Sequence, residues 1–363
     1  MNKNRRSRYL KSLWIVALVM IVLSAVLSSR NSAHAAGKSA FTVLAGQHYD
    51  VGDVLAFAPQ TIRVHRGDSI TWKFNPVHDV HFVDKPLDFV VTLDIDGQKV
   101  PGMNSAIAFP NAQSGDAVKP GLNTGVLGNP GGPIEFTAVM DLAPGTYTYL
   151  CDIHAGMVGQ ITVVEDTVDI PTPSDVDKQG QKELSDIVSK ADSTYITNED
   201  AGQSAVKDNT LAVSAGFSAG AGSVNRFFPS VGVIQEGQSV NWTVPAGLEP
   251  HTINFSLPAD GSIPEALVVV IDKKGTPFVT FGKTLVPTAK TGDSFTGADL
   301  GSGFLLPTQS FALKFPKAGV YKYFCAVHPG QVGTIVVLPA SVPLSPPAAA
   351  TQAATAAGTA AAK

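Results

Sequence analysis

The feature that most constrains the fold of this 363-residue chain is an internal repeat. Residues 43–72 align with 213–242 at a constant offset, with ten identities in thirty positions. A second block is stronger, because residues 145–164 match 319–338 with ten identities in twenty. Repeated blocks in the same order indicate two copies of one structural unit. The sequence therefore predicts two homologous domains.

We expect these domains over residues 41–165 and 210–339. Inside each repeat apolar and polar residues alternate, as in Thr61–Val64 and Ser69–Phe74, which is the period of half-buried strands. Glycine-containing turns such as His65–Asp68 separate them. The 34 Gly and 25 Pro, with only 15% charged residues, fit a turn-rich β protein. The predicted fold class is all-β, with two tandem β-sandwich domains.

The segments outside the repeats differ in composition. Residues 166–209 form a predicted linker, in which Pro173 can start an amphipathic helix that runs to about Ala191. Residues 340–363 are rich in Ala and Pro, have little to bury, and are expected to form a disordered tail.

The first 35 residues have the parts of an export signal: a basic stretch to Lys11, an apolar run over 13–27, and small residues at positions 33 and 35. We expect cleavage before Ala36. The alternative is an uncleaved membrane anchor, since residues 12–29 carry no charge. Either outcome predicts an extracytoplasmic location: periplasmic, cell-surface or secreted.

Charge and cysteine content narrow the function classes. Six of the 26 Lys and Arg lie in residues 1–35, which leaves 20 basic against 30 acidic residues in the remainder. That balance argues against nucleic-acid binding, which needs a basic surface. The two cysteines, Cys151 and Cys325, could form a disulfide in an exported protein. They occupy equivalent repeat positions, however, and a bridge between such positions would be unusual.

A metal-binding pattern surrounds the first cysteine. His154 follows Cys151 by three residues and Met157 follows by three more, so that thiolate, imidazole and thioether lie in one short loop. His78 lies 73 residues upstream, directly after a predicted strand and turn. One Cys, two His and a weak axial Met are the ligand set of a blue-copper site. The first domain is therefore predicted to bind copper.

The second repeat holds the equivalent set His251, Cys325 and His328, with Gln331 at the axial position. The chain can thus bind up to two coppers. A Gln oxygen is a harder donor than a thioether and favours Cu(II). We therefore expect a lower reduction potential at the second site than at the first.

These segments resemble the plastocyanin/azurin family of cupredoxins. The resemblance is carried by Val77–Phe82 and Pro250–Phe255 around the first ligand, and by Gly145–His154 and its second copy around the others. It implies Greek-key sandwiches with one type 1 copper each, which shuttle single electrons between redox partner proteins. The short Cys-x-x-His-x-x-Met loop is similar to that of amicyanin, and axial Gln is a feature of stellacyanin-like proteins.

Two departures from the family pattern stand out. The segment between the first His and the Cys is longer than in plastocyanin, with room for an inserted hairpin, and the linker is not part of the pattern. The resemblance also favours His78 over His81 as the ligand, since the family places Phe four residues later, as at Phe82. His81 is then expected beside the ligands or at the surface, and Asp79 and Thr252 could hydrogen-bond to the cysteine loops.

His48 and His65 are expected to be solvated rather than ligating. Small residues beside the loop histidines, Ala155-Gly156 and Pro329-Gly330, are expected to leave the imidazole edges near the surface for a partner to approach.

Three other functions stay open. A copper enzyme of the two-domain nitrite reductase or laccase type needs a His beside the ligand Cys, whereas the neighbours here are Leu150, Asp152, Phe324 and Ala326. A copper carrier or storage protein would more often be Met-rich, and this chain has five Met. A structural role would leave the paired ligand sets unexplained. We expect an electron-transfer protein without catalytic residues, and a membrane association only through an uncleaved N-terminal segment.

Overall fold

The computed structural model describes residues 38–128, 133–201, 206–247, 249–255, 266–297 and 299–344. The expected export signal and most of the expected C-terminal tail lie outside this part of the chain. Neither of the two helices in the described ranges is both long and apolar enough to cross a membrane.

The strands follow the same order in both halves of the chain. The first half contains β1 (Ala40–Tyr49), β2 (Gly52–Ala58), β3 (Thr61–His65), β4 (Ser69–Phe74), β5 (Val90–Ile95), β6 (Gln98–Met103), β7 (Glu135–Val139), β8 (Gly145–Leu150) and β9 (Val158–Val164). The second half contains β10 (Thr210–Ala219), β11 (Gly222–Phe228), β12 (Val231–Gln235), β13 (Ser239–Thr243), β14 (Leu267–Ile271), β15 (Pro277–Phe281), β16 (Ser310–Lys314), β17 (Gly319–Phe324) and β18 (Val332–Leu338).

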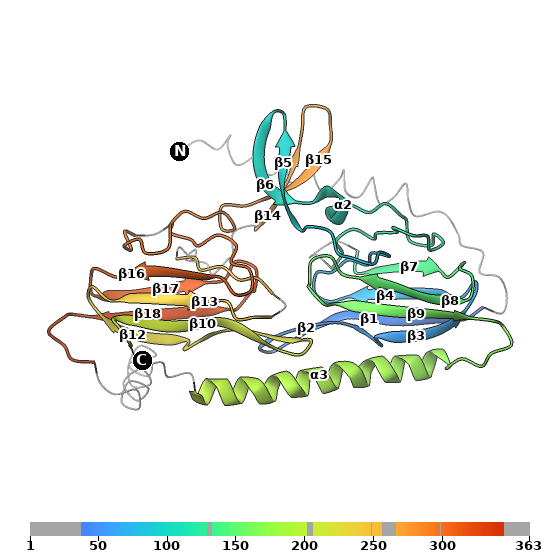
Figure 1. Cartoon of the computed structure of the whole chain (residues 1–363), viewed down its shortest axis with the longest axis horizontal. Coiled ribbons are helices and arrows are strands. Elements are labelled where there is room, and N and C mark those ends of the chain that lie inside the picture. Colours follow the sequence, from blue (N-terminus) through green and yellow to red (C-terminus); the bar gives the residue numbers. More distant parts are fainter. Residues whose placement is uncertain are drawn as a thin grey trace, which may run out of the picture.

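Each half is a β-sandwich, which confirms the predicted fold class (Figure 1). In the first, β7-β4-β1-β2 faces β3-β9-β8, and in the second, β16-β13-β10-β11 faces β12-β18-β17. Alternating residues enter the core, as in β3, where Ile62 and Val64 are buried and the residues on either side of them are more exposed. Equivalent tryptophans, Trp72 and Trp242, are fully buried at the centres of two separate apolar clusters.

The two sandwiches share one continuous sheet. Strand β2 pairs with β11 in antiparallel register, which joins the two four-stranded layers into eight strands. The approach is close enough to require glycine, because a Cβ on Gly52 would lie 1.8 Å from the carbonyl oxygen of Ser223. Backbone hydrogen bonds and polar side-chain contacts, including one from the Tyr49 hydroxyl to the Ser223 carbonyl, therefore fix one domain against the other.

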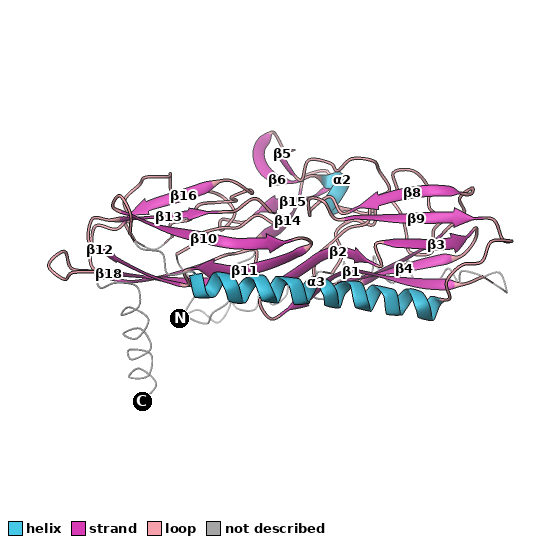
Figure 2. Cartoon of the chain, turned by 60° about the horizontal axis from the view of Figure 1, so that its bottom comes forward, coloured by secondary structure: helices cyan, strands magenta, loops and turns pink. Residues whose placement is uncertain are grey.

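Helix α3 (Pro173–Ala201) spans this joint. It lies along the shared sheet and packs on β1 and β2 of one domain and β10 and β11 of the other (Figure 2). Val176, Leu184 and Ala191 are its most buried apolar residues. The sequence predicts a helix that ends near Ala191, but the structure extends it by ten residues. The reason is tertiary, since the second domain provides a surface that the extra turns can cover.

A separate four-stranded sheet projects above the joint. The hairpins β5–β6 and β14–β15 are inserted at equivalent points in the two domains, and they pair through β6 and β15 (Figure 1). The short helix α2 (Ser105–Ala108) follows the first hairpin. These insertions account for the long segment that the sequence shows between the first histidine and the cysteine.

Candidate metal centres

The first candidate centre is built on the loop between β8 and β9. Cys151 follows directly after β8, and its backbone N–H donates to the carbonyl of Met157 at 3.0 Å. The N–H of Met157 donates to the carbonyl of His154 at 3.2 Å, which closes the loop into a tight turn before β9. Cys151 and Met157 are each 2% exposed. The loop thus holds the three predicted ligands together inside the end of the sandwich.

His78 reaches the same point from the other side of the sandwich. Its backbone pairs with Leu127 through two hydrogen bonds, and its imidazole is fully buried. The Sγ of Cys151 lies 3.7 Å from Nδ1 of His78 and 3.5 Å from Nδ1 of His154, and the two nitrogens are 2.9 Å apart. Three donor atoms therefore face one another.

The second centre repeats this arrangement after β17. Cys325 Sγ lies 3.9 Å from Nδ1 of His251 and 3.4 Å from Nδ1 of His328, and those nitrogens are 3.1 Å apart. Gln331 is fully buried and places Oε1 2.9 Å from Nδ1 of His251. Its Nε2 is buried without a hydrogen-bond partner in the described part of the chain. The amide oxygen thus already points at the donor triangle.

Two repeated glycines explain how the first histidine of each centre fits. Gly46 and Gly216 both adopt positive φ, at 80° and 78°, which few other residues tolerate. A Cβ would lie 2.2 Å from Nε2 of His78 at the first position and 2.6 Å from Nε2 of His251 at the second. The identity of these glycines in the repeat is therefore a packing requirement of the site.

The surroundings of the two centres differ. In the first, Asp79 Oδ1 accepts from the N–H of Asp152 at 2.8 Å, and Asp152 Oδ2 lies 2.7 Å from Nδ1 of His81. This ties the cysteine loop down, as expected for Asp79. His81 is only 6% exposed, so the alternative of a surface position is wrong. It is buried because its Asp152 partner satisfies the imidazole.

The second centre has neutral groups at the same places. Thr252 Oγ1 accepts from the N–H of Ala326 at 2.7 Å and from Nδ2 of Asn254 at 2.8 Å. The backbone N–H of Thr252 also points at Cys325 Sγ, at 3.4 Å. The tether to the cysteine loop is therefore kept, but without a carboxylate.

The two thiols also differ in the direction in which their surroundings shift the pKa. Burial, and then the nearby Asp79, raises the pKa of Cys151 well above its ordinary value. Burial also acts to raise the pKa of Cys325, but His328 and His251 overcome it and hold that pKa well below the ordinary value. Burial and Asp152 raise the pKa of Asp79 to about 7. Without metal, the second thiol ionises more readily than the first.

Glu249 is a site residue that sequence reasoning missed. It is 6% exposed, and its Oε1 lies 3.3 Å from Nε2 of His328 and 3.9 Å from Nε2 of His154. Burial would raise the pKa of Glu249, but His328 and then His154 hold it well below its ordinary value. The sequence contains one hint of this role. Glu249 lies two residues before His251, and the equivalent position in the first repeat, two residues before His78, is Pro76.

The same contacts overturn one expectation. The loop imidazole edges do not face solvent for a partner to approach, since the side chains of His154 and His328 are 13% and 8% exposed. They face each other across the domain joint, with Glu249 between them. Burial lowers the pKa of His154 to about 4, with Glu249 opposing the shift. Burial also acts to lower the pKa of His328, but Glu249 and Cys325 raise it well above its ordinary value.

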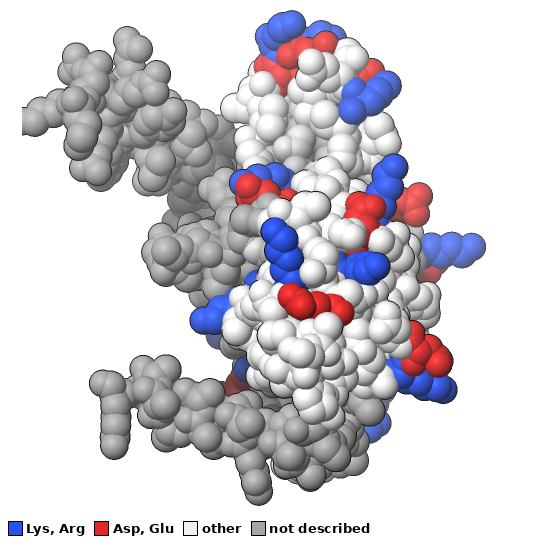
Figure 3. All heavy atoms as spheres, turned by 90° about the vertical axis from the view of Figure 1, so that its left-hand side faces the viewer, with Lys and Arg blue, Asp and Glu red and all other residues white. Residues whose placement is uncertain are grey.

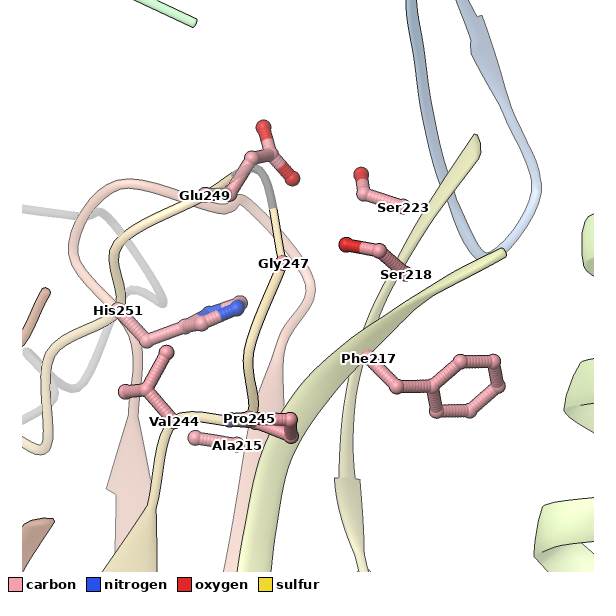
Figure 4. Close-up of a pocket in the computed structure, with 9 residues that line it drawn as sticks. All are labelled: Ala215, Phe217, Ser218, Ser223, Val244, Pro245, Gly247, Glu249 and His251. Atoms are coloured by element: carbon pink, nitrogen blue, oxygen red, sulfur yellow. The ribbon is translucent and has the colours of Figure 1, made fainter. Parts of the chain in front are cut away.

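A small pocket opens beside Glu249 (Figure 4). Ser218 and Ser223, from β10 and β11, line it opposite the carboxylate, and His251 lies at its other side. Oε2 of Glu249 is buried without a hydrogen-bond partner in the described ranges.

The remaining sequence candidates lie elsewhere. The two cysteines are free and each sits in its own domain, so the disulfide alternative is wrong. His48 is exposed and lies 2.8 Å from Asp53, and His65 lies 2.8 Å from the carbonyl of Val168. Neither approaches a donor triangle.

The donor chemistry fits copper better than the hard cations. Each centre offers a thiolate and two imidazoles, with a thioether or an amide oxygen nearby, and carboxylates are not among the facing atoms. Residues 45–164 match the family model of copper binding proteins of the plastocyanin/azurin family. This segment is therefore similar in sequence to that family.

Two further likenesses cover only part of the chain. A plastocyanin from Synechococcus sp. (strain JA-2-3B'a(2-13)) is 31% identical over 113 residues, which cover 30% of this chain and 64% of that protein. Structures of amicyanin mutants, among them one in the oxidised and one in the Cu(I) form, are 18% and 20% identical and cover 37% of this chain and 86% of theirs, with a TM-score of 0.22.

Proposed function

We propose that this chain is an electron-transfer protein with one type 1 copper site in each domain. The observation that carries the proposal is the repeated triangle of one sulfur and two Nδ1 atoms, with sides between 2.9 and 3.9 Å. The ligands are His78, Cys151, His154 and axial Met157 in the first domain, and His251, Cys325, His328 and axial Gln331 in the second. Copper, when bound, supplies a reversible one-electron change.

The protein's own contribution is to fix these ligands in position and to shield them from solvent. The first histidine of each centre is anchored by a backbone pair, to Leu127 in one domain and to Leu305 in the other. Asp79 and Thr252 fix the cysteine loops from behind. A donor set that cannot relax between two oxidation states lowers the reorganisation that accompanies electron transfer.

We further propose an extracytoplasmic protein that exchanges electrons with redox partner proteins and performs no catalysis of its own. On the face shown in Figure 3, basic and acidic side chains are interspersed rather than gathered into a basic surface. That distribution agrees with the acidic balance of residues 36–363 in arguing against a nucleic-acid partner. A copper enzyme would need a further metal site.

The first experiment is an absorption and EPR spectrum of copper-loaded protein, with copper counted on the same sample. Two coppers per chain, an intense blue band and narrow copper hyperfine splitting are expected. A colourless protein would refute the proposal. A third, colourless copper would instead support an enzyme, and the cluster to examine first would be Asp79, His81 and Asp152, whose potential ligand atoms lie within 4.8 Å of one another.

A further inference from the structure

Glu249 lies between the two centres. Each loop histidine turns Nδ1 toward its own cysteine and Nε2 toward the same carboxylate oxygen, at 3.3 Å for His328 and 3.9 Å for His154. The two Nε2 atoms are therefore no more than about 7 Å apart, although they belong to different domains.

The burial of this carboxylate needs an explanation. An ionised carboxylate removed from water is costly unless opposite charge or hydrogen-bond donors surround it. Its Oε2 has no hydrogen-bond partner in the described part of the chain, and its Oε1 faces Nε2 of His328 and Nε2 of His154. The two imidazoles are thus the positively polarised groups beside this carboxylate oxygen, and the carboxylate is placed to act on them.

The arrangement is fixed and asymmetric. Pairing of β2 with β11 sets the distance between the domains, and α3 packs across the same joint. The first repeat has Pro76 where the second has Glu249, so it supplies no equivalent carboxylate. One side chain from the second domain therefore serves both centres.

We propose that Glu249 is a positioning residue shared by both copper sites, which orients the two loop imidazoles and lowers both reduction potentials. This inference rests on the proposed function. A negative charge near a ligand imidazole favours the more positive, oxidised state of the site. The effect is larger at His328, the nearer partner, but it crosses the domain joint to His154.

The test measures each site alone. Cys325→Ser leaves only the first blue site and Cys151→Ser leaves only the second, and Glu249→Gln is introduced into both proteins. We expect the reduction potential to rise in both proteins. At the second site the one-electron equilibrium constant should change about tenfold, which equals 59 mV. At the first site it should change about threefold. An unchanged potential at the first site would overturn the proposal.

Two further variants separate charge from structure. Glu249→Asp keeps the charge and should hold both potentials closer to the parent values than Glu249→Gln, whereas equal shifts would overturn the proposal. Glu236→Gln is the matched control, because Glu236 binds the N–H of Ala318 beyond the start of β17, at the opposite end of that strand from Cys325. It should move neither potential.

A second readout does not depend on potentials. In the reduced, diamagnetic Cu(I) protein, Glu249→Gln should change the 15N NMR shifts of Nε2 in both His154 and His328. A change confined to His328 would contradict a shared role. If neither single-site protein shows a blue band at the outset, the proposed function itself fails, and this outcome is distinct from a blue protein whose potentials ignore Glu249.

Discussion

The two candidate metal centres have nearly the same donor geometry in different surroundings. Donor distances agree to within 0.2 Å between the domains, and both centres use a repeated glycine to admit the first histidine. The first has Met157 and a buried Asp79–Asp152–His81 chain, and the second has Gln331 and neutral Thr252, Asn254 and Ala326. Duplication therefore preserved the triangle while its surroundings diverged.

Two of these differences are expected to act in opposite directions on the gap between the two potentials. An axial amide oxygen favours Cu(II) more than a thioether does, so the proposed axial Gln331 would lower the potential of the second site. A buried carboxylate beside the Cys151 loop favours the same oxidised state at the first site. The axial ligands alone therefore do not determine which of the two potentials is higher. Mutations that change one site at a time separate the contribution of each residue.

The largest expected effect comes from removing one thiolate. Cys151→Ser should abolish the blue band of the first site and leave that of the second, and Cys325→Ser should do the reverse, because the sulfur-to-copper charge-transfer band needs the thiolate. Absorption spectra with copper counts check this. If either variant keeps two blue sites, the assignment of that cysteine as a ligand is wrong.

The repeated glycines give the next test. Gly46→Ala should displace His78 and weaken copper binding at the first site by more than about tenfold, since the new Cβ would lie 2.2 Å from the imidazole at positive φ. Gly216→Ala should act on the second site in the same way but more weakly, because its nearest contact is 2.6 Å. Copper titration of both variants gives the comparison, and equal effects would contradict it.

The carboxylate beside the first site should affect stability through pH. In the folded protein the pKa of Asp79 is raised to about 7, whereas in the unfolded chain it is near 4. Protonated Asp79 therefore contributes its full stabilisation below about pH 4, and this contribution is lost as pH rises through 7. Asp79→Asn should therefore stabilise the metal-free protein at pH 8 by about 2–4 kcal/mol, at about 1.4 kcal/mol per pKa unit. Little gain is expected at pH 4.

Urea unfolding at pH 4 and pH 8 measures this difference. Thr252→Asn is the matched control in the second domain, where no carboxylate is replaced, and its effect should not depend on pH. A pH-independent effect of Asp79→Asn would show that burial of the charge does not control the stability of this domain.

Exchanging the axial residues should have a smaller effect than removing a thiolate, because both thiolates stay in place. Gln331→Met should raise the reduction potential of the second site, and Met157→Gln should lower that of the first. Each shift should be on the order of 100 mV, which is somewhat less than a hundredfold change in the one-electron equilibrium constant at 59 mV per tenfold. Voltammetry of single-site proteins gives both values. Unchanged potentials would mean that these side chains do not act on the metal.

The sequence predicted the parts of the molecule that local pattern determines. Two-residue alternation gave strands such as β3 and β4, and the repeat paired both cysteine loops. The short spacing from Cys151 to Met157 can be recognised without a structure, because all three side chains leave one loop.

The features that it did not predict depend on contacts between distant segments. Nothing in the local sequence of Gly52–Val54 or Gly222–Val224 indicates that these segments pair with each other and do not remain solvent-exposed sheet edges. Without that pairing, Glu249 is an ordinary loop carboxylate and the histidine edges have no reason to be buried. His81 could not be placed in the interior either, since its burial depends on Asp152, 71 residues away.

The register of the joint has a consequence for assembly. Gly52 pairs with Val224, Asp53 with Ser223 and Val54 with Gly222, so equivalent residues of the two repeats exchange places across the contact. This is the self-complementary pattern of a twofold dimer interface. Here both halves belong to one chain, so their effective concentration is set by the covalent connection and not by the amount of protein present. Dilution therefore cannot separate the two centres.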